Sequence, residues 1–164
     1  MTAICAHAKL TERYFYESFT SRDEVLQKVL DGIADEVREA GLDALRASGG
    51  TLEQRVRNAI ASFVTILTDD PRKGRVAMIE SAAFEPLRTH RRAALRGFAQ
   101  MVADEATRMY GDRAWPPHQG EINGLLFVGG LAELVTAWLN DEIAITPDEI
   151  VDAATYQFTS TAHR

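Results

Sequence analysis

The sequence predicts an all-α protein that consists of an N-terminal helix-turn-helix unit followed by a helical bundle. Apolar residues recur at helical spacing in one segment after another, as Leu26, Val29 and Ile33 do. Most of these segments follow a helix-start signal, and no segment alternates apolar and polar residues as a half-buried strand would. Helices are therefore the regular elements that we expect throughout the chain.

The N-terminal stretch carries the most specific pattern. A segment of small residues (3–10) precedes a short segment with four aromatic residues (11–19), and a long helix begins near residue 22. This order is typical of a helix-turn-helix. In that motif the second helix enters the major groove of DNA and the first helix crosses the backbone.

Side-chain spacing gives the short aromatic segment an inner and an outer side. Thr11 is the expected N-cap, with its hydroxyl accepting a free backbone N–H. Phe15 and Phe19 are four residues apart, so they share one face and are expected to pack inward. The residues left on the outer side, available to base edges or phosphates, are Arg13, Tyr14 and Ser18.

These residues resemble the DNA-binding signature of the tetracycline-repressor (TetR) family. The resemblance rests on ICAHAKLT (residues 4–11) followed by FYESFTSRDEVL (residues 15–26). It implies that Tyr16 contacts a phosphate and that Arg22 replaces the family's basic residue at the start of its fourth helix. The DNA-binding residues implied by this reading are Lys9, Thr11, Arg13, Tyr14, Tyr16, Ser18 and Arg22.

The chain departs from the family pattern in two ways. Cys5 stands in place of the usual Ala, and Lys9 in place of the Gly that tolerates a positive φ at the turn. Family members also carry a further helix before this motif, whereas this chain begins at Met1. We therefore expect a truncated helix-turn-helix domain over residues 1–28, which binds operator DNA more weakly than a form with the first helix restored.

The remainder, residues 29–164, is expected to be a helical ligand-binding and dimerisation domain. Capping signals at Ser21, Thr51 and Thr146 and the pairs Asp70-Pro71 and Glu85-Pro86 mark the helix starts. The expected helices run from 21 to near 48–50, from 51 to 70, from 71 to about 83, from 85 to 111, from about 118 to 141, and from 146 onward.

The helix over 118–141 is apolar around most of its circumference, which predicts burial on more than one side. With the last helix it resembles the C-terminal dimerisation pair of the TetR family, including the pattern Gly-Leu-x-Glu-Leu-x-x-x-Trp-Leu. The residues expected at a homodimer interface are Phe127, Gly130, Leu131, Leu134, Trp138, Val151 and Phe158.

The family resemblance also implies an effector cavity among the middle helices. Adaptable and aromatic side chains on neighbouring helices favour a small hydrophobic ligand. The ligand-binding residues expected on this basis are Phe63, Leu67, Met78, Phe98, Met101, Asn123 and Phe127. Polar residues near the apolar stripes that could orient an effector are Glu80, Gln100 and Asn123.

Composition excludes several other classes. A net charge of −6 argues against coating nucleic acid by charge alone, although it allows a groove reader. A single cysteine excludes an internal disulfide framework and favours the cytoplasm, and no uninterrupted apolar run approaches the roughly 20 residues of a membrane span. No catalytic motif and no metal-ligand spacing of the four histidines is present, so we expect neither an enzyme nor a metal or cofactor.

The arginines from Arg88 to Arg96 are expected to form a solvated face, with a second nucleic-acid surface as the alternative.

Two functional hypotheses follow. The first is a homodimeric, ligand-responsive transcriptional regulator, a repressor of the TetR type that binds double-stranded operator DNA in the major groove. The second is a helical dimer that binds a small molecule or a protein and has lost DNA binding through N-terminal truncation.

Overall fold

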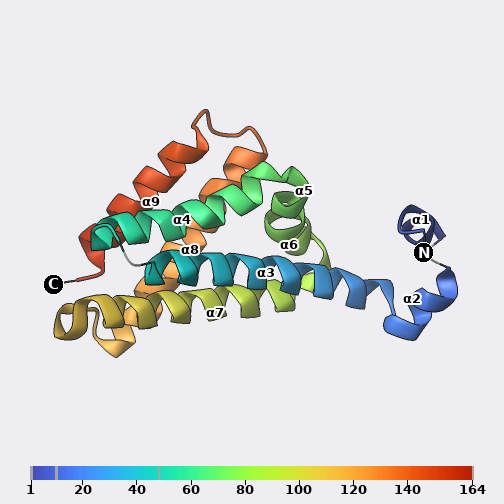
Figure 1. The fold of residues 1–164 in the computed structure, drawn as a ribbon, viewed down its shortest axis with the longest axis horizontal. Helices are drawn as coiled ribbons and strands as arrows, with labels where there is room; N and C mark the ends of the chain where they lie inside the picture. The colour runs from blue at the N-terminus through green and yellow to red at the C-terminus, as the bar shows by residue number, and fades with distance from the viewer. Residues whose placement is uncertain (1, 10, 48, 164) are drawn as a thin grey trace.

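Helices form the regular elements of the structure, a computed structural model that describes residues 2–9, 11–47 and 49–163 (Figure 1). Within these ranges the one strand-like pairing is an isolated bridge between Ala114 and His163. The predicted all-α fold class is therefore confirmed.

The helices follow the predicted order, with one irregular stretch in the middle. They are α1 (Thr2–His7), α2 (Glu12–Ser18), α3 (Arg22–Arg46), α4 (Leu52–Asp69), α5 (Pro71–Gly74), the π-helix η1 (Arg75–Glu80), α6 (Ser81–Ala83), α7 (Glu85–Tyr110), the 3-10 helix η2 (Gly111–Arg113), α8 (Pro117–Leu139) and α9 (Pro147–Thr161). Leu10, in the predicted turn, and Ser48, near a predicted helix end, lie outside the described residues.

Side-chain caps fix the starts of α3, α4 and α9. Complete capping boxes join Thr51 to Gln54 and Thr146 to Glu149, as the sequence predicts. At α3 the box is only half formed: the Ser21 hydroxyl accepts from the Glu24 N–H, but the Glu24 carboxylate turns to Thr20 instead. These caps satisfy backbone donors that a helix start leaves free.

The segment between α4 and α7 differs from the single helix predicted up to about Ala83. Asp70 caps α5, and its hydrogen bonds with Arg72 lower the pKa of that carboxyl to about 2. The next segment, η1, is a π-helix, in which hydrogen bonds join residues five apart instead of four. A Cβ on Gly74 would lie 2.3 Å from the Leu67 carbonyl oxygen, so Gly at this position lets α5 fold back closely onto α4.

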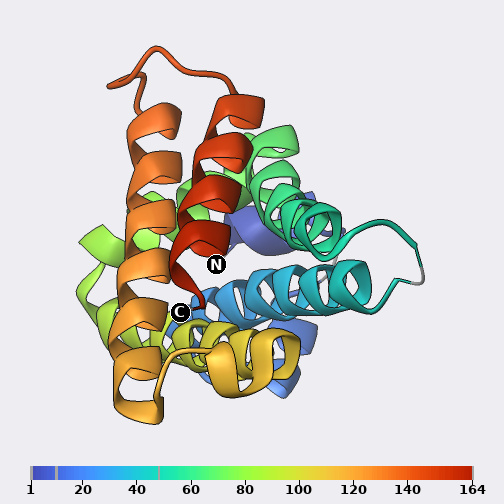
Figure 2. The same cartoon turned by 90° about the vertical axis from the view of Figure 1, so that its left-hand side faces the viewer.

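The body is a bundle of five long helices around one apolar core (Figure 2). α3 and α7 lie side by side with their N-termini at the same end, and α4 returns antiparallel along α3 (Figure 1). α8 and α9 complete the bundle, α8 packed on α7 and α9 on α4. Among the most deeply buried side chains are Leu67 of α4, Val135 of α8 and Ile150 of α9.

α3 connects the body to the N-terminal pair α1 and α2, which we call the head. The head stands apart at the N-terminal end of α3 (Figure 1). With 25 residues, α3 is about 38 Å long. It runs unbroken through the proposed domain boundary at residues 28 and 29, and its first buried residue is Leu30. The head and the body therefore share one rigid element.

α8 has a wide apolar surface that the protomer does not cover. It is the one helix in the described ranges that is long and apolar enough, by length and composition alone, to cross a membrane. The helix is interrupted by polar residues such as Asn123 and Glu133, so it contains no uninterrupted apolar run of that length. A core helix of a soluble protein meets the same two criteria, but only 28% of the apolar window of α8 is buried in the protomer.

The contact between α7 and α8 depends on Gly124. A Cβ at this position would lie 2.4 Å from the carbonyl oxygen of Ala99, a distance that real Cβ contacts do not reach. Gly97, also inside α7, has nothing within 4 Å of its ideal Cβ position. The two glycines thus differ in packing although both lie in helices.

We predict opposite effects of alanine at these two positions. Gly124→Ala should destabilise the fold by about 2 kcal/mol, because α7 and α8 must separate. Gly97→Ala is the matched control and should stabilise the fold by up to about 1 kcal/mol through helix propensity. Urea unfolding of both variants measures the difference, and equal stability of the two would contradict the close approach of the helices.

Candidate functional site

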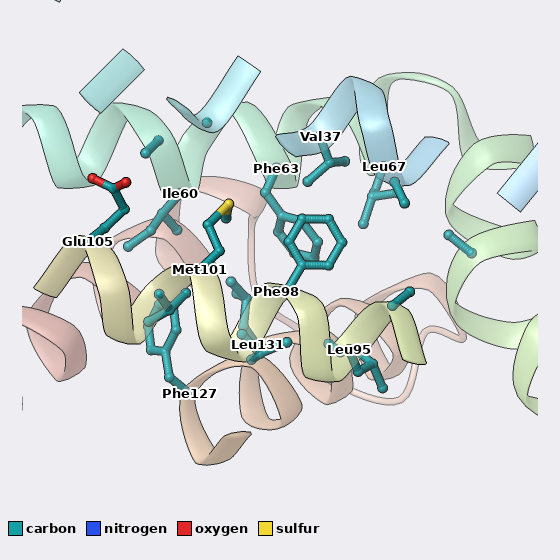
Figure 3. A pocket seen from close by; sticks show the side chains of 18 of the residues that line it. Val37, Ile60, Phe63, Leu67, Leu95, Phe98, Met101, Glu105, Phe127 and Leu131 are labelled. Carbon is teal, nitrogen blue, oxygen red and sulfur yellow. The ribbon is translucent and has the colours of Figure 1, made fainter. Parts of the chain in front are cut away.

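An apolar cavity of about 150 Å³ lies inside the body. Its walls come from α3, α4, α7 and α8, with Ala77 and Met78 of η1 and Phe158 of α9 closing it. Figure 3 shows Phe63 and Phe98 facing each other across it, with Met101 beside them. Engineered cavities of this volume with apolar walls stay dry and admit a single aromatic ring.

Most of the predicted ligand-binding residues meet at this cavity. The predicted residues that line it are Phe63, Leu67, Met78, Phe98, Met101 and Phe127. Asn123 does not line it: it lies one residue before Gly124, where α8 packs on α7, and the lining positions of α8 begin at Phe127. Glu80 and Gln100 are also absent from the lining, so none of the three predicted polar residues can orient a ligand there.

The polar residues that do line the cavity are Arg91 and Glu105, both on α7. The Glu105 carboxylate accepts a hydrogen bond from Arg108 at 2.6 Å. The Arg91 Nε is buried and has no hydrogen-bond partner among the described residues. Of the predicted arginine face, Arg88, Arg92 and Arg96 are exposed, whereas Arg91 is half-buried and its Nε is fully buried.

Sequence reasoning missed Arg91 although the spacing held a signal. Arg91 follows Leu87 by four residues and precedes Leu95 by four, so it belongs to the buried stripe of α7. Because the neighbouring arginines on the same helix are exposed, the spacing of Arg91 with Leu87 and Leu95 was not recognised as a sign of burial. The contribution of α3 to the cavity, from residues such as Ile33 and Val37, was also not predicted.

Two polar contacts join α3 to α7 beside the cavity. The Arg38 guanidinium lies 5.5 Å from the ring centroid of Phe98, a cavity residue. Nearer the head, His90 Nε2 is 2.5 Å from an Asp31 carboxylate oxygen. A displacement of Phe98 would therefore directly change a contact made by α3.

In the head, the turn between α1 and α2 has a backbone conformation that glycine adopts more readily than lysine. Lys9 adopts a φ of 55°, which costs a residue with a Cβ about 1 kcal/mol. The Lys9 N–H donates to the Ala6 carbonyl at 3.2 Å. Thr11 occupies the N-cap position of α2, but its side chain makes no cap hydrogen bond, contrary to the prediction. Instead, Glu12 accepts from the Thr2 hydroxyl at 2.7 Å and ties α2 to α1.

The aromatic residues of α2 divide as the spacing predicts. Phe15 is buried and packs edge-on against Tyr16 and tilted against Phe19, with ring centroids 5.3 and 5.5 Å away. Tyr14 and Tyr16 are 58% and 60% exposed, so both hydroxyls are accessible from outside. Arg13 is exposed but forms an ion pair with Glu17 at 2.8 Å.

The remaining predicted DNA-binding residues, Lys9, Ser18 and Arg22, are exposed. Lys9 and Arg22 form no ion pair with the described residues, so their charges remain available. Hydrogen bonds from the Thr20 hydroxyl and N–H lower the pKa of Glu24, which keeps a negative charge close to Arg22. The head therefore presents two free cations beside several carboxylates.

The predicted dimerisation residues do not form one surface. Phe127, Leu131, Val151 and Phe158 are buried in the core of the chain, so they offer little surface to a partner. Leu134 and Trp138 are half-buried, and only Gly130 of the predicted set is exposed. The burial of α8 on more than one side stays a prediction, because within the chain only 28% of its apolar window is buried.

A different face of α8 is apolar and open. Ile122, Leu125 and Leu126 are 47%, 40% and 65% exposed. Gly129 and Gly130 continue this stripe at helical spacing, and an added Cβ would meet nothing within 4 Å at either position. We call these five residues the α8 stripe.

Two other kinds of site were considered in the described part of the chain, a metal centre and a reactive thiol. No group of three or more His, Cys, Asp or Glu side chains is arranged there to hold a metal ion. Cys5 is a free thiol buried in the head.

Comparison with known proteins does not assign a family. No family model matches this chain. No curated protein matches it either. A function for this chain is therefore proposed from its residues and their geometry alone.

Proposed function

We propose that this chain is a ligand-responsive DNA-binding transcriptional regulator of the TetR type, most consistent with a cytoplasmic repressor. The observation that carries the proposal is the double role of α3. Its N-terminal end holds the head, and its middle contributes Leu30, Ile33, Val37 and Gly41 to the cavity wall. A molecule that enters the cavity must therefore contact the helix that positions the head.

The cavity sets the class of effector. With about 150 Å³ and almost entirely apolar walls, it suits one aromatic ring or a short alkyl chain. Met78 and Met101 line it and can rearrange around ligands of different shape. An effector changes DNA binding only if it prefers one arrangement of α3 and α7 over another.

The head supplies groups suited to DNA. The exposed hydroxyl of Tyr16 and the free cations of Lys9 and Arg22 are suited to phosphate oxygens. Arg13 and Tyr14 lie on the outer side of α2, where a recognition helix meets base edges. Arg13 must leave Glu17 to contact a guanine, which lowers the gain from that contact.

A homodimer would present two heads to DNA. The α8 stripe is the surface that we assign to the dimer, in place of the buried residues predicted from sequence. Its glycines allow a partner helix to approach closely. Dimeric helix-turn-helix proteins read two half-sites about 34 Å apart.

The second candidate is a helical dimer that binds a small molecule or a protein without DNA. The charge of the head favours it: among residues 1–28, Lys9, Arg13, Arg22 and Lys28 are balanced by Glu12, Glu17, Asp23 and Glu24. Few counterions would be released on binding, so the affinity that does not depend on sequence would be small.

For the DNA-binding proposal, we predict that selection from random duplexes at low salt yields a preferred two-fold sequence. Arg13→Ala should cost about 1–3 kcal/mol on that sequence and relax one base preference. Arg22→Ala should weaken binding to all sequences and reduce the salt slope by about 1. Fluorescence anisotropy of labelled duplexes measures both effects.

The matched control for Arg22→Ala is Arg46→Ala, an exposed arginine at the opposite end of the same helix. It should bind DNA as the wild type does. If no duplex is enriched and the wild type does not bind at low salt, the DNA-reading role is wrong and the second candidate stands.

For the dimer, we predict that Leu126→Glu yields monomers. The substitution places a charge in the centre of the α8 stripe, where a partner helix would leave it buried without a partner. Val29→Glu changes another exposed apolar residue, on α3, and should leave the dimer intact. Analytical sedimentation at tens of micromolar measures the oligomeric state, and a monomeric wild type would refute the assignment of the α8 stripe to a dimer interface.

A further inference from the structure

We propose that the cavity binds an amphipathic anion: a small apolar chain or ring that ends in a carboxylate, with the carboxylate held by Arg91. This inference rests on the proposed ligand binding and deepens it, because it names the chemistry of the ligand's polar end.

The starting observation is a buried donor without an acceptor. The Nε of Arg91 is out of contact with solvent and has no hydrogen-bond partner among the described residues. No ion pair of the described chain includes Arg91. Buried polar groups are almost always paired, and leaving one unpaired costs stability, more so when it is charged. Such a group at a cavity wall indicates an acceptor that comes from outside the chain.

The carboxylates nearest to this part of α7 are already engaged. On the facing stretch of α3, Asp31 contacts His90 and Asp35 pairs with Arg38. These four residues line a polar hollow beside the cavity, and Ala94 borders both spaces. The protein therefore pairs its other charges here and leaves Arg91 without an anion.

The opposite end of the cavity has the reverse polarity. Glu105 lies 14 residues after Arg91 on α7, which places the two about 21 Å apart along the helix. Its carboxylate is already bound by Arg108. An anionic ligand is attracted to the Arg91 end, whereas the Glu105 end offers it no unpaired cation, so the charges fix its direction. Its apolar part then lies among Phe63, Phe98 and the other aromatic and aliphatic residues between them.

The geometry of the guanidinium selects a carboxylate over a neutral group. Arginine donates from a planar fork, and it binds carboxylates through two parallel hydrogen bonds that are stronger than those to a neutral acceptor. An alcohol of the same length fills the same apolar space but accepts only from a single oxygen. The two ligands thus separate the contribution of the charge from that of the cavity.

The test compares octanoate with octanol by calorimetric titration of the full chain. The wild type should bind octanoate at least tenfold more tightly than octanol. Arg91→Gln should remove that difference by weakening octanoate at least tenfold while changing octanol less than twofold. The matched control is Arg92→Gln, which removes the same charge from the next, exposed residue and should leave both affinities unchanged.

A second measurement guards against a merely structural effect. Arg91→Met removes the unpaired donor and keeps an apolar stem, so the ligand-free variant should melt at the wild-type temperature or above. A clear loss of thermal stability would mean that Arg91 holds the fold together, and would overturn the assignment.

The remaining outcomes separate this inference from the proposed function. Equal affinity of the wild type for both ligands, or equal loss of both in Arg91→Gln, refutes the anion site but keeps a cavity for neutral ligands. An equal loss of octanoate binding in Arg92→Gln shows a general charge effect and also refutes it. If neither ligand binds, ligand binding by this cavity is itself wrong.

Discussion

The packing of α3 against α4 and α7 is the constraint on which the rest of the structure depends. One continuous helix of 25 residues carries the head at its N-terminal end and forms part of the cavity wall in its middle, so the head and the cavity are attached to the same element. Apolar residues on one side of α3 form a wall of the cavity, and Arg38 reaches across to Phe98 on α7. Any change in the separation of α3 and α7 must move the head or strain the helix.

This arrangement has a cost in stability. An unfilled apolar cavity of about 150 Å³ costs on the order of 3–4 kcal/mol relative to a filled core. The buried Nε of Arg91 and the positive φ of Lys9 add to it. Functional sites are where sequences depart from good packing and complete hydrogen bonding. Two of the departures in this fold, the buried Nε of Arg91 and the positive φ of Lys9, lie in the cavity wall and in the head.

Much of the fold could be predicted from the sequence because caps and periodicity are local. The boxes at Thr51 and Thr146 and the pair Asp70-Pro71 locate helix starts without any tertiary information. The π-helix η1 could not be predicted in this way, since its wider turn depends on how Met78 and its neighbours pack against the core. The cap expected from the Thr11 hydroxyl is not formed, although Thr11 has the extended backbone conformation of an N-cap residue.

The candidate sites show where periodicity becomes ambiguous. The periodicity of apolar residues indicates that a residue is buried, but it does not indicate whether the same chain or a partner chain covers that residue. The sequence predicts Leu131 and Val151 at a dimer interface, but both are buried in the core, while Leu125 and Leu126 on the same apolar helix as Leu131 are exposed. The charge of Arg91 places it among exposed arginines in the sequence, and the polarity of Asn123 makes it a candidate there, although Asn123 does not line the cavity and Arg91 does.

The most direct test of the coupling through α3 is thermodynamic linkage between the cavity and the head. The affinity for a selected duplex is measured with and without saturating octanoate, and the affinity for octanoate with and without the duplex. Coupling through α3 predicts that both ratios are equal and lie between about 5 and 150. Ratios of one, with both ligands bound, would show that the cavity and the head act independently and would contradict the account.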